Sequence, residues 1–224
     1  MKFQVIIPAR ANSQRLPGKN MRKLGDRHLI EYSIDYALSF FPDNSIWVNS
    51  DDLEVINLAR EKGVQTLIRP QFLANDNTPT VDVLKFQLKY FQEQAIKCDA
   101  IILLQPTNPF RDVDLLKIAM KTFLGAKRNS LATFSPSRRK LGKIANNSYE
   151  PLNYLPGQRS QDLEILYFEN GLLYITKCDS ILEGKIITDD VIPIIVDSFG
   201  SSIDIDYLED FQMAEAILKI NRDE

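Results

Sequence analysis

The stretch from residue 9 to residue 20, ARANSQRLPGKN, holds the densest set of side chains that could bind an anion. Its candidate ligands are the cations Arg10, Arg15 and Lys19 and the polar residues Asn12, Ser13 and Asn20. A triphosphate requires both kinds, because its charge must be neutralised while its oxygens receive hydrogen bonds. The stretch is neither a GxxxxGK(S/T) phosphate loop nor a GxGxxG dinucleotide loop. We therefore predict an anion site of another type; the alternative is a solvated basic loop.

Two carboxylates near the end of the chain are candidate metal ligands. Asp204 and Asp206 close a short apolar segment, 202–206, which we expect to be a strand. Strand alternation would place both carboxylates on one face, where they could hold Mg²⁺ beside phosphate oxygens. The D-x-D pattern is common, and the alternative is a strand end followed by a helix cap. The pattern is evidence for a metal site only if the two aspartates face Arg10 and Lys19 in the folded chain.

Two polar segments follow other predicted strands. Gln105 begins QPTNPFR, and its amide can both donate and accept, as recognition of a nucleobase requires. A turn stiffened by structural prolines explains that segment equally well. Arg69 leaves a further strand and is followed by a polar stretch that ends with Thr78, Pro79 and Thr80; the alternative is a surface arginine beside a helix cap.

The segment FENG, 168–171, precedes an apolar run that contains Tyr174. Asn170 with Gly171 predicts a turn at the start of a strand. Taken alone, this segment predicts a backbone turn and does not indicate a binding site.

Other chemistries have few candidate residues. The chain has one histidine, His28, and two cysteines, Cys98 and Cys178. A tetrahedral zinc site would need nearly all of them, and a Ser-His-Asp triad could use only His28. We interpret His28 as a loop or helix-start residue, so chemistry is expected from Arg, Lys, Asp, Glu and a metal.

The composition is typical of one soluble globular domain, which we predict to span residues 1–224. Of the 224 residues, 44% are hydrophobic and 25% are charged, and the net charge is -3. The negative charge argues against nucleic acid or an anionic membrane as a partner. Two cysteines form no disulfide framework, which favours the cytoplasm. The first apolar run is short and is interrupted by Pro8, so no signal peptide is expected, and no segment is long enough to span a bilayer.

Strands and helices are predicted to alternate along most of the chain. The expected strands are 3–8, 45–49, 64–68, 99–104, 130–134, 172–175, 191–196 and 202–206. The expected helices contain 29–38, 53–59, 79–90, 115–123 and 208–218, with Asp51 or Asp52, Thr78 and Asp112 as helix starts. This alternation predicts an α/β fold with a mostly parallel sheet covered on both faces. The polar segment 135–168 breaks the alternation and predicts an excursion, either a hairpin or a subunit contact.

Six runs in this order resemble the acylneuraminate cytidylyltransferase family. They are IIPARANSQRLPGKN, WVNSDD, the stretch 69–76, LLQPTNPFR, ENGLLYI and SIDIDYLEDF. The resemblance implies a Rossmann-like, three-layer α/β nucleotidyltransferase with a mixed sheet. It also implies a homodimer in which a protruding element, here 135–168, crosses to the partner's active site.

The resemblance also assigns roles. It implies that Arg10 and Lys19 hold the CTP phosphates and act in catalysis, and that Asp204 and Asp206 bind Mg²⁺ or, for Asp206, act as the base. The implied nucleotide and sugar ligands are Asn12, Ser13, Asn20, Arg69, Thr80, Gln105, Arg159, Gln161, Asn170 and Tyr174.

The expected reaction transfers CMP from CTP to the anomeric hydroxyl of a nonulosonic, sialic-acid-like sugar and releases pyrophosphate. Two departures lie on the sugar side. Ile186-Ile187 stands where bacterial sialic acid synthetases have paired phenylalanines, and Phe168 stands where some members have arginine. The alternatives are pseudaminic, legionaminic or 3-deoxy-octulosonic acid as substrate, or a non-catalytic nucleotide-binding protein on the same fold.

Overall fold

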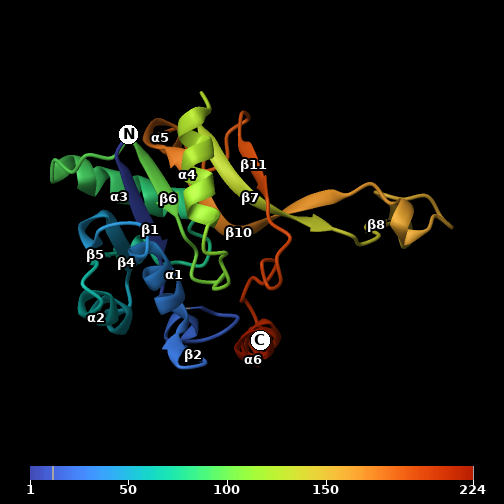
Figure 1. Cartoon of the computed structure of the whole chain (residues 1–224), viewed down its shortest axis with the longest axis horizontal. Helices are drawn as coiled ribbons and strands as arrows, with labels where there is room; N and C mark the ends of the chain where they lie inside the picture. Colours follow the sequence, from blue (N-terminus) through green and yellow to red (C-terminus); the bar gives the residue numbers. More distant parts are fainter. Residues whose placement is uncertain (12, 224) are drawn as a thin grey trace.

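A seven-stranded sheet forms the centre of the molecule (Figure 1). The computed structural model describes residues 1–11 and 13–223. The strands, in spatial order, are β11 (Ile192–Ile195), β7 (Ser130–Ser137), β10 (Leu166–Lys177), β6 (Ala100–Leu103), β1 (Phe3–Pro8), β4 (Ile46–Ser50) and β5 (Gln65–Ile68). Only β10 is antiparallel to its neighbours in this sheet, β6 and β7. The predicted mostly parallel sheet is therefore confirmed, with one reversed strand.

Alternating apolar residues direct helices to both faces of the sheet. In β1, Val5 and Ile7 pack into one cluster and Ile6 into another. The first cluster includes residues of α1 (Leu29–Leu38), α2 (Leu53–Glu61) and α4 (Leu115–Gly125). The second includes residues of α3 (Thr80–Glu93) and α5 (Cys178–Leu182). Since both faces of the strands are buried, their runs are almost wholly apolar, as parallel sheets require.

A third apolar cluster joins the two ends of the chain. It packs Leu16 and Leu24 against Ile205, and against Phe211 of α6 (Leu208–Asp223). The small elements around it are η1 (Lys19–Met21), β2 (Lys23–Leu24) and β3 (Arg27–His28). His28 precedes α1, and its backbone N–H donates to Glu31, which confirms its helix-start interpretation.

The structure differs from the sequence predictions at four places. The helix α3 starts at Thr80 with Pro79, not Thr78, before it, because the first helical bond runs from Asp82 N to the carbonyl of Pro79. Likewise α4 starts after Asp114 rather than at Asp112. Segment 202–206 is not a strand, since Ile205 pairs through its N–H with a loop carbonyl, that of Thr107.

The fourth difference concerns Asn170 and Gly171. They lie inside β10 rather than in a turn at its start, where its pairing with β7 shifts register between Glu169 and Tyr174. Gly171 has a φ of 70°. Such a left-handed residue interrupts a strand without ending it, which is a typical β-bulge. The predicted turn at a strand start is therefore wrong: Asn170 and Gly171 form an irregularity within β10.

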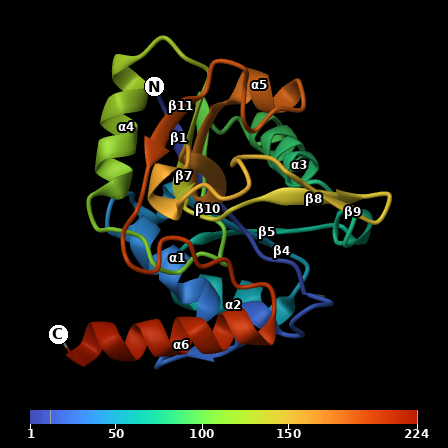
Figure 2. The same ribbon diagram turned by 90° about the vertical axis from the view of Figure 1, so that its right-hand side faces the viewer.

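A long arm projects from the sheet where the polar excursion was predicted (Figure 1). The outer parts of β7 and β10 carry it, and it ends in the hairpin of β8 (Gly142–Ala145) and β9 (Ser148–Pro151), followed by η4 (Ser160–Asp162). Asn146 and Asn147 have φ values of 51° and 60°, as a two-residue hairpin turn requires. Figure 2 shows the arm from its tip, in front of the sheet.

The remaining short elements are η2 (Asp43–Ser45) and η3 (Gln71–Leu73), which lie in connections at the β4–β5 side of the sheet. Within the described part of the chain, no helix combines the length and apolarity needed to cross a membrane.

Candidate active site

A cavity of about 310 Å³ opens at the carboxyl ends of β1 and β6. This is the edge at which open α/β sheets bind ligands. Of the residues predicted from sequence, its walls include Arg10, Ser13, Lys19, Asn20, Arg69, Thr80, Gln105, Asp204 and Asp206. Segments from both ends of the chain therefore meet here. Asn12, also predicted, lies outside the described residues.

The loop after β1 is held in shape from within. Gly18 takes a φ of 66°, which turns the chain into η1 and buries Lys19 and Asn20. The side-chain amide of Asn20 donates to the carbonyl of Arg10 at 3.1 Å. The buried Leu16 fixes the middle of the loop to the apolar cluster shared with Ile205. In the described part of the loop, these contacts hold the backbone at Arg10 and around Lys19 in place.

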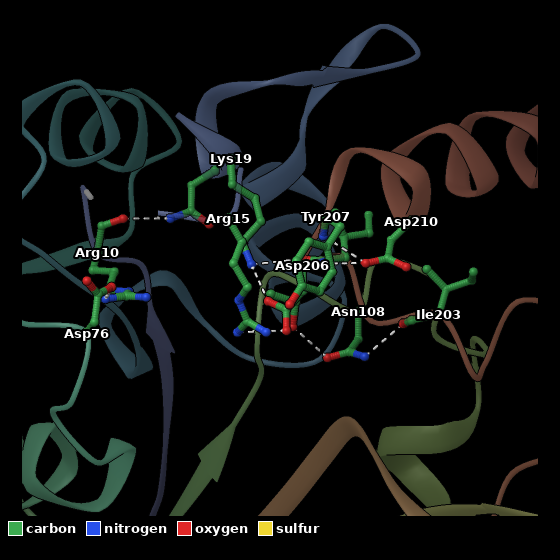
Figure 3. Close-up of polar contacts among 12 residues, drawn as sticks. Arg10, Arg15, Lys19, Asp76, Asn108, Ile203, Asp206, Tyr207 and Asp210 are labelled. Atoms are coloured by element: carbon green, nitrogen blue, oxygen red, sulfur yellow. Dashed lines mark hydrogen bonds and ion pairs between the residues drawn. The ribbon is translucent and has the colours of Figure 1, made fainter. Parts of the chain in front are cut away.

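Asp206 forms ion pairs with two cationic side chains (Figure 3). The Nζ atom of Lys19 lies 3.0 Å from its Oδ1, and an Nη atom of Arg15 lies 2.9 Å from its Oδ2. Lys19 also donates to the carbonyl of Ile205 at 2.7 Å. The backbone N–H groups of Asp206 and Tyr207 donate to the carboxylate of Asp210, which lies in the first turn of α6. Asp206 is thus fixed at its backbone and at its side chain.

Asp204 lies on the same cavity wall with a different electrostatic environment. It is open to the cavity, yet the surrounding protein removes enough water to raise the pKa of its carboxyl, and the charge of Asp206 raises it further. Such a pair is stabilised by a cation between the two carboxylates. Among the described residues no cluster of three or more His, Cys, Asp and Glu side chains could hold a metal by itself. Mg²⁺ commonly binds through one or two carboxylates together with substrate phosphates, and this pair fits that pattern.

Arg69 is buried, not exposed as the alternative reading required. Its guanidinium donates to the side chain of Asn49 at 2.9 Å and to the backbone carbonyl of Asn49 at 3.0 Å. Burial lowers the pKa of Arg69 to about 10, so it stays charged at neutral pH. Asn49 is the penultimate residue of β4, and its side-chain amide donates to Gln87 of α3 at 3.0 Å.

Arg10 forms an ion pair with Asp76 across the cavity. Sequence reasoning assigned no role to Asp76. The available signal was a single acidic residue in a polar stretch, Asn75 to Thr80, that follows a basic strand end. An acidic residue next to a predicted phosphate ligand is recognisable only once the two loops are placed together.

A second cavity lies beside the first and shares Thr80 and Gln105 with it. Its apolar lining residues are Val81, Leu103, Ile186 and Ile187. Tyr174 and Glu169 also line it, and the Tyr174 hydroxyl donates to Glu169 at 3.3 Å. Burial, then Glu169, raises the pKa of Tyr174, so its hydroxyl remains protonated. Glu169 is a cavity residue to which sequence reasoning gave no role.

Three predicted sugar ligands line neither cavity. The side chain of Asn170 is buried and engaged with Thr133 and Ser135. Arg159 and Gln161 lie in the arm, where Arg159 pairs with Asp162. In this chain Asn170 therefore supports the bulge of β10, and the two arm residues are not part of the cavities of their own chain.

The order and placement of these groups agree with a known family. Residues 4–219 match the model of a family described as cytidylyltransferase. The chain belongs to this cytidylyltransferase family. The match spans the first loop, both cavities and the Asp204–Asp206 segment.

Named relatives of this cytidylyltransferase act on several nonulosonic acids. A CMP-N,N'-diacetyllegionaminic acid synthase of Legionella pneumophila is 30% identical, with 100% of this chain and 99% of the relative covered. A pseudaminic acid cytidylyltransferase of Campylobacter jejuni is 29% identical, with 100% and 99% covered. An N-acylneuraminate cytidylyltransferase of Streptococcus agalactiae is 29% identical over 83% of this chain but 46% of the relative, so the chain spans about half of it.

Solved structures agree on the architecture. A CMP:2-keto-3-deoxy-manno-octonic acid synthetase complexed with CTP superposes with a TM-score of 0.72 over 99% of this chain and 100% of the other. The sequence identity is 15%, so this likeness concerns the fold alone.

Proposed function

We propose that this cytidylyltransferase transfers CMP from CTP to the anomeric hydroxyl of a nonulosonic acid and releases pyrophosphate. The observation that carries the proposal is the meeting of Lys19 and Arg15 with Asp206 in one cavity. Cations for a triphosphate and carboxylates for a metal are then within reach of the same phosphate group.

CTP would enter by exchanging ion pairs. In the ligand-free protein Arg10 is paired with Asp76, and Arg15 and Lys19 are paired with Asp206. Phosphate oxygens can replace these carboxylates without leaving a cation unpaired, which keeps the cost of desolvation low. Asn12, Ser13 and Asn20 would bind the nucleotide beside them. Arg69 and Gln105 lie on the opposite wall, where Gln105 can read a polar edge of the base.

Mg²⁺ would be held by Asp204 and Asp206 next to the phosphates. When bound, it would neutralise charge on the triphosphate and polarise the phosphorus that is attacked. The protein's part is to keep the two carboxylates in place. Lys19 does so for Asp206 through their ion pair.

In the reaction, the anomeric oxygen of the sugar forms a bond to the α-phosphorus of CTP. The bond from that phosphorus to the bridging oxygen of pyrophosphate breaks, and pyrophosphate carries the electron pair away. The hydroxyl proton passes to a base, and Asp206 is the candidate in the cavity, a role that is the alternative to holding the metal. Lys19, Arg10 and Arg15 stabilise the charge that develops on the transferred and departing groups.

The sugar would occupy the second cavity, next to the shared residues Thr80 and Gln105. Its apolar lining residues, Val81, Leu103 and the Ile186-Ile187 pair, suit methyl-bearing substituents such as N-acyl groups. The hydroxyl of Tyr174 supplies a polar contact in the same cavity. This favours an N-acylated nonulosonic acid over the wholly hydroxylated 3-deoxy-octulosonic acid, while sialic, legionaminic and pseudaminic acids all remain candidates.

We also propose a homodimer and a cytoplasmic location. The arm, 135–168, exposes large apolar side chains at Ile144, Leu152 and Leu155, which a second copy of the chain could cover. Arg159 and Gln161 would then reach the partner's sugar site. The proposed unit is one cytidylyltransferase domain, residues 1–224. The location rests on the low cysteine content.

The test is pyrophosphate release from CTP with a panel of sugars, with and without Mg²⁺. The panel contains N-acetylneuraminic, N,N'-diacetyllegionaminic, pseudaminic and 3-deoxy-octulosonic acids. We expect Mg²⁺-dependent release with at least one N-acylated sugar. CTP binding without release from any sugar would instead support a non-catalytic nucleotide-binding protein.

A further inference from the structure

One fully buried amide connects the two cavities without lining either of them. Asn108, in the loop after β6, is 0% exposed. Its Nδ2 atom donates to the carbonyl of Asn170 at 2.6 Å and to the carbonyl of Ile203 at 2.9 Å. Both amide hydrogens are therefore used, and both go to backbone. Figure 3 shows Asn108 between the Asp206 segment and Ile203.

The two carbonyls belong to segments that reach different cavities. Asn170 directly follows Glu169, which lines the second cavity. Ile203 directly precedes Asp204, which lines the first. The residues are 62 and 95 positions from Asn108 in sequence, so no local structure fixes their spacing. This amide therefore ties the bulge of β10 to the acidic segment, beside the backbone hydrogen bond from Ile205 to the carbonyl of Thr107.

The surroundings hold this amide in one orientation. Its Oδ1 accepts from the hydroxyl of Thr107 at 3.0 Å, which distinguishes the oxygen end from the nitrogen end. Gly171 leaves the space for it, since a Cβ there would lie 2.7 Å from Oδ1 of Asn108 and 2.7 Å from Oε1 of Gln105. The glycine is thus required by close approach as well as by its φ of 70°.

We propose that Asn108 is a positioning residue, which sets the distance between the sugar and the Asp204–Asp206 pair and so aligns the attacking hydroxyl with the α-phosphorus. The inference rests on the proposed function, because it assigns the two cavities to the two substrates. In-line displacement is sensitive to such spacing: a misplacement of about 1 Å can reduce the rate about 100-fold. Asn108 touches no substrate, so its effect is exerted through the backbone.

The decisive variant is Asn108→Asp, which keeps the shape but turns a donor into an oxygen facing two carbonyl oxygens. We expect kcat to fall about 100-fold, while the KM for CTP changes less than about 3-fold. Calorimetry should show unchanged CTP binding without Mg²⁺ and about 10-fold weaker binding with it, because the acidic pair has moved. Asn108→Ser, which keeps one donor, should show a smaller loss in the same measurements.

Gln4→Met provides the control for lost stability. Gln4 is buried near the amino end of β1, the end opposite the first cavity, and its Oε1 accepts from Nε1 of Trp47 at 3.1 Å; it lines neither cavity. It should lower the melting temperature and leave kcat and Mg²⁺-dependent CTP binding intact. The proposal is overturned if the Asn108 variants lose only stability, as this control does, or if neither variant folds. If the parent itself converted no sugar, the proposed function would fail, and the calorimetric comparison would still decide the role of Asn108.

Discussion

Lys19 and Asp206 are separated by 187 residues in the chain, yet their charged atoms lie 3.0 Å apart. The lysine is buried against the carbonyl of Ile205, so its charge is fixed at one point of the cavity wall. A cation in this position compensates the charge of Asp206 and lies within reach of a phosphate bound in the cavity.

Lys19→Ala should lower kcat/KM for CTP about 100- to 1000-fold, the usual effect of losing one preorganised charge at a reacting centre. Initial rates of pyrophosphate release measure this. Lys23→Ala is the matched control, because Lys23 is an exposed lysine four residues further along and should be neutral. Parent-like turnover by a folded Lys19→Ala protein would remove the first loop from the mechanism.

Asp204→Asn should abolish Mg²⁺-dependent turnover while making the metal-free protein more stable. The folded state raises the pKa of Asp204, so its stabilising contribution is complete below the ordinary pKa of an aspartate and is lost as the pH rises through the raised value. The side-chain amide of the Asp204→Asn variant carries no charge, so the variant does not lose this stability at neutral pH. We expect a gain in melting temperature of about 1–3 °C, small because the side chain remains open to water.

The gain should vanish at a pH below the ordinary aspartate pKa, where parent and variant are both uncharged at residue 204. Differential scanning calorimetry across pH provides the comparison. A variant less stable than the parent at neutral pH would show that the Asp204 charge is already compensated in the free protein.

Tyr174→Phe should raise the KM for the sugar about 5-fold and leave the KM for CTP unchanged. The variant removes one hydroxyl from the second cavity, and a net hydrogen bond contributes about 1 kcal/mol. Tyr90→Phe serves as the control, because Tyr90 packs edge-on against Trp47 away from the cavities. An equal rise in the KM for CTP would mean that the second cavity is not a separate sugar site.

Ile144→Asp should convert a dimer into monomers with lower activity, if the arm contacts a second copy. The residue is 80% exposed at the tip of the arm, so the substitution costs the single chain little. Light scattering at several concentrations gives the mass. Ile118→Asp, on the exposed face of α4, is the control and should leave the mass unchanged. The same mass for both variants and the parent would place any contact elsewhere.

The parts of the fold governed by local periodicity were predictable. The helical spacing of Leu29, Ile30 and Ile34 and the unbroken apolar run of β6 gave their elements within a few residues. Predictions went wrong where a distant partner overrides local preference. Segment 202–206 looks like a strand, but a loop carbonyl rather than a strand takes the N–H of Ile205.

The sequence by itself determined which chemistry was available: one histidine excluded several mechanisms, and clustered cations with a late acidic pair indicated a metal-bound nucleotide. Only the tertiary structure decided which of those groups meet. It paired Arg10 with Asp76, turned Asn170 away from both cavities and placed Glu169 in one of them. Side-chain types are fixed by the covalent chain, whereas distances between residues far apart in sequence are fixed by packing alone, which no local pattern encodes.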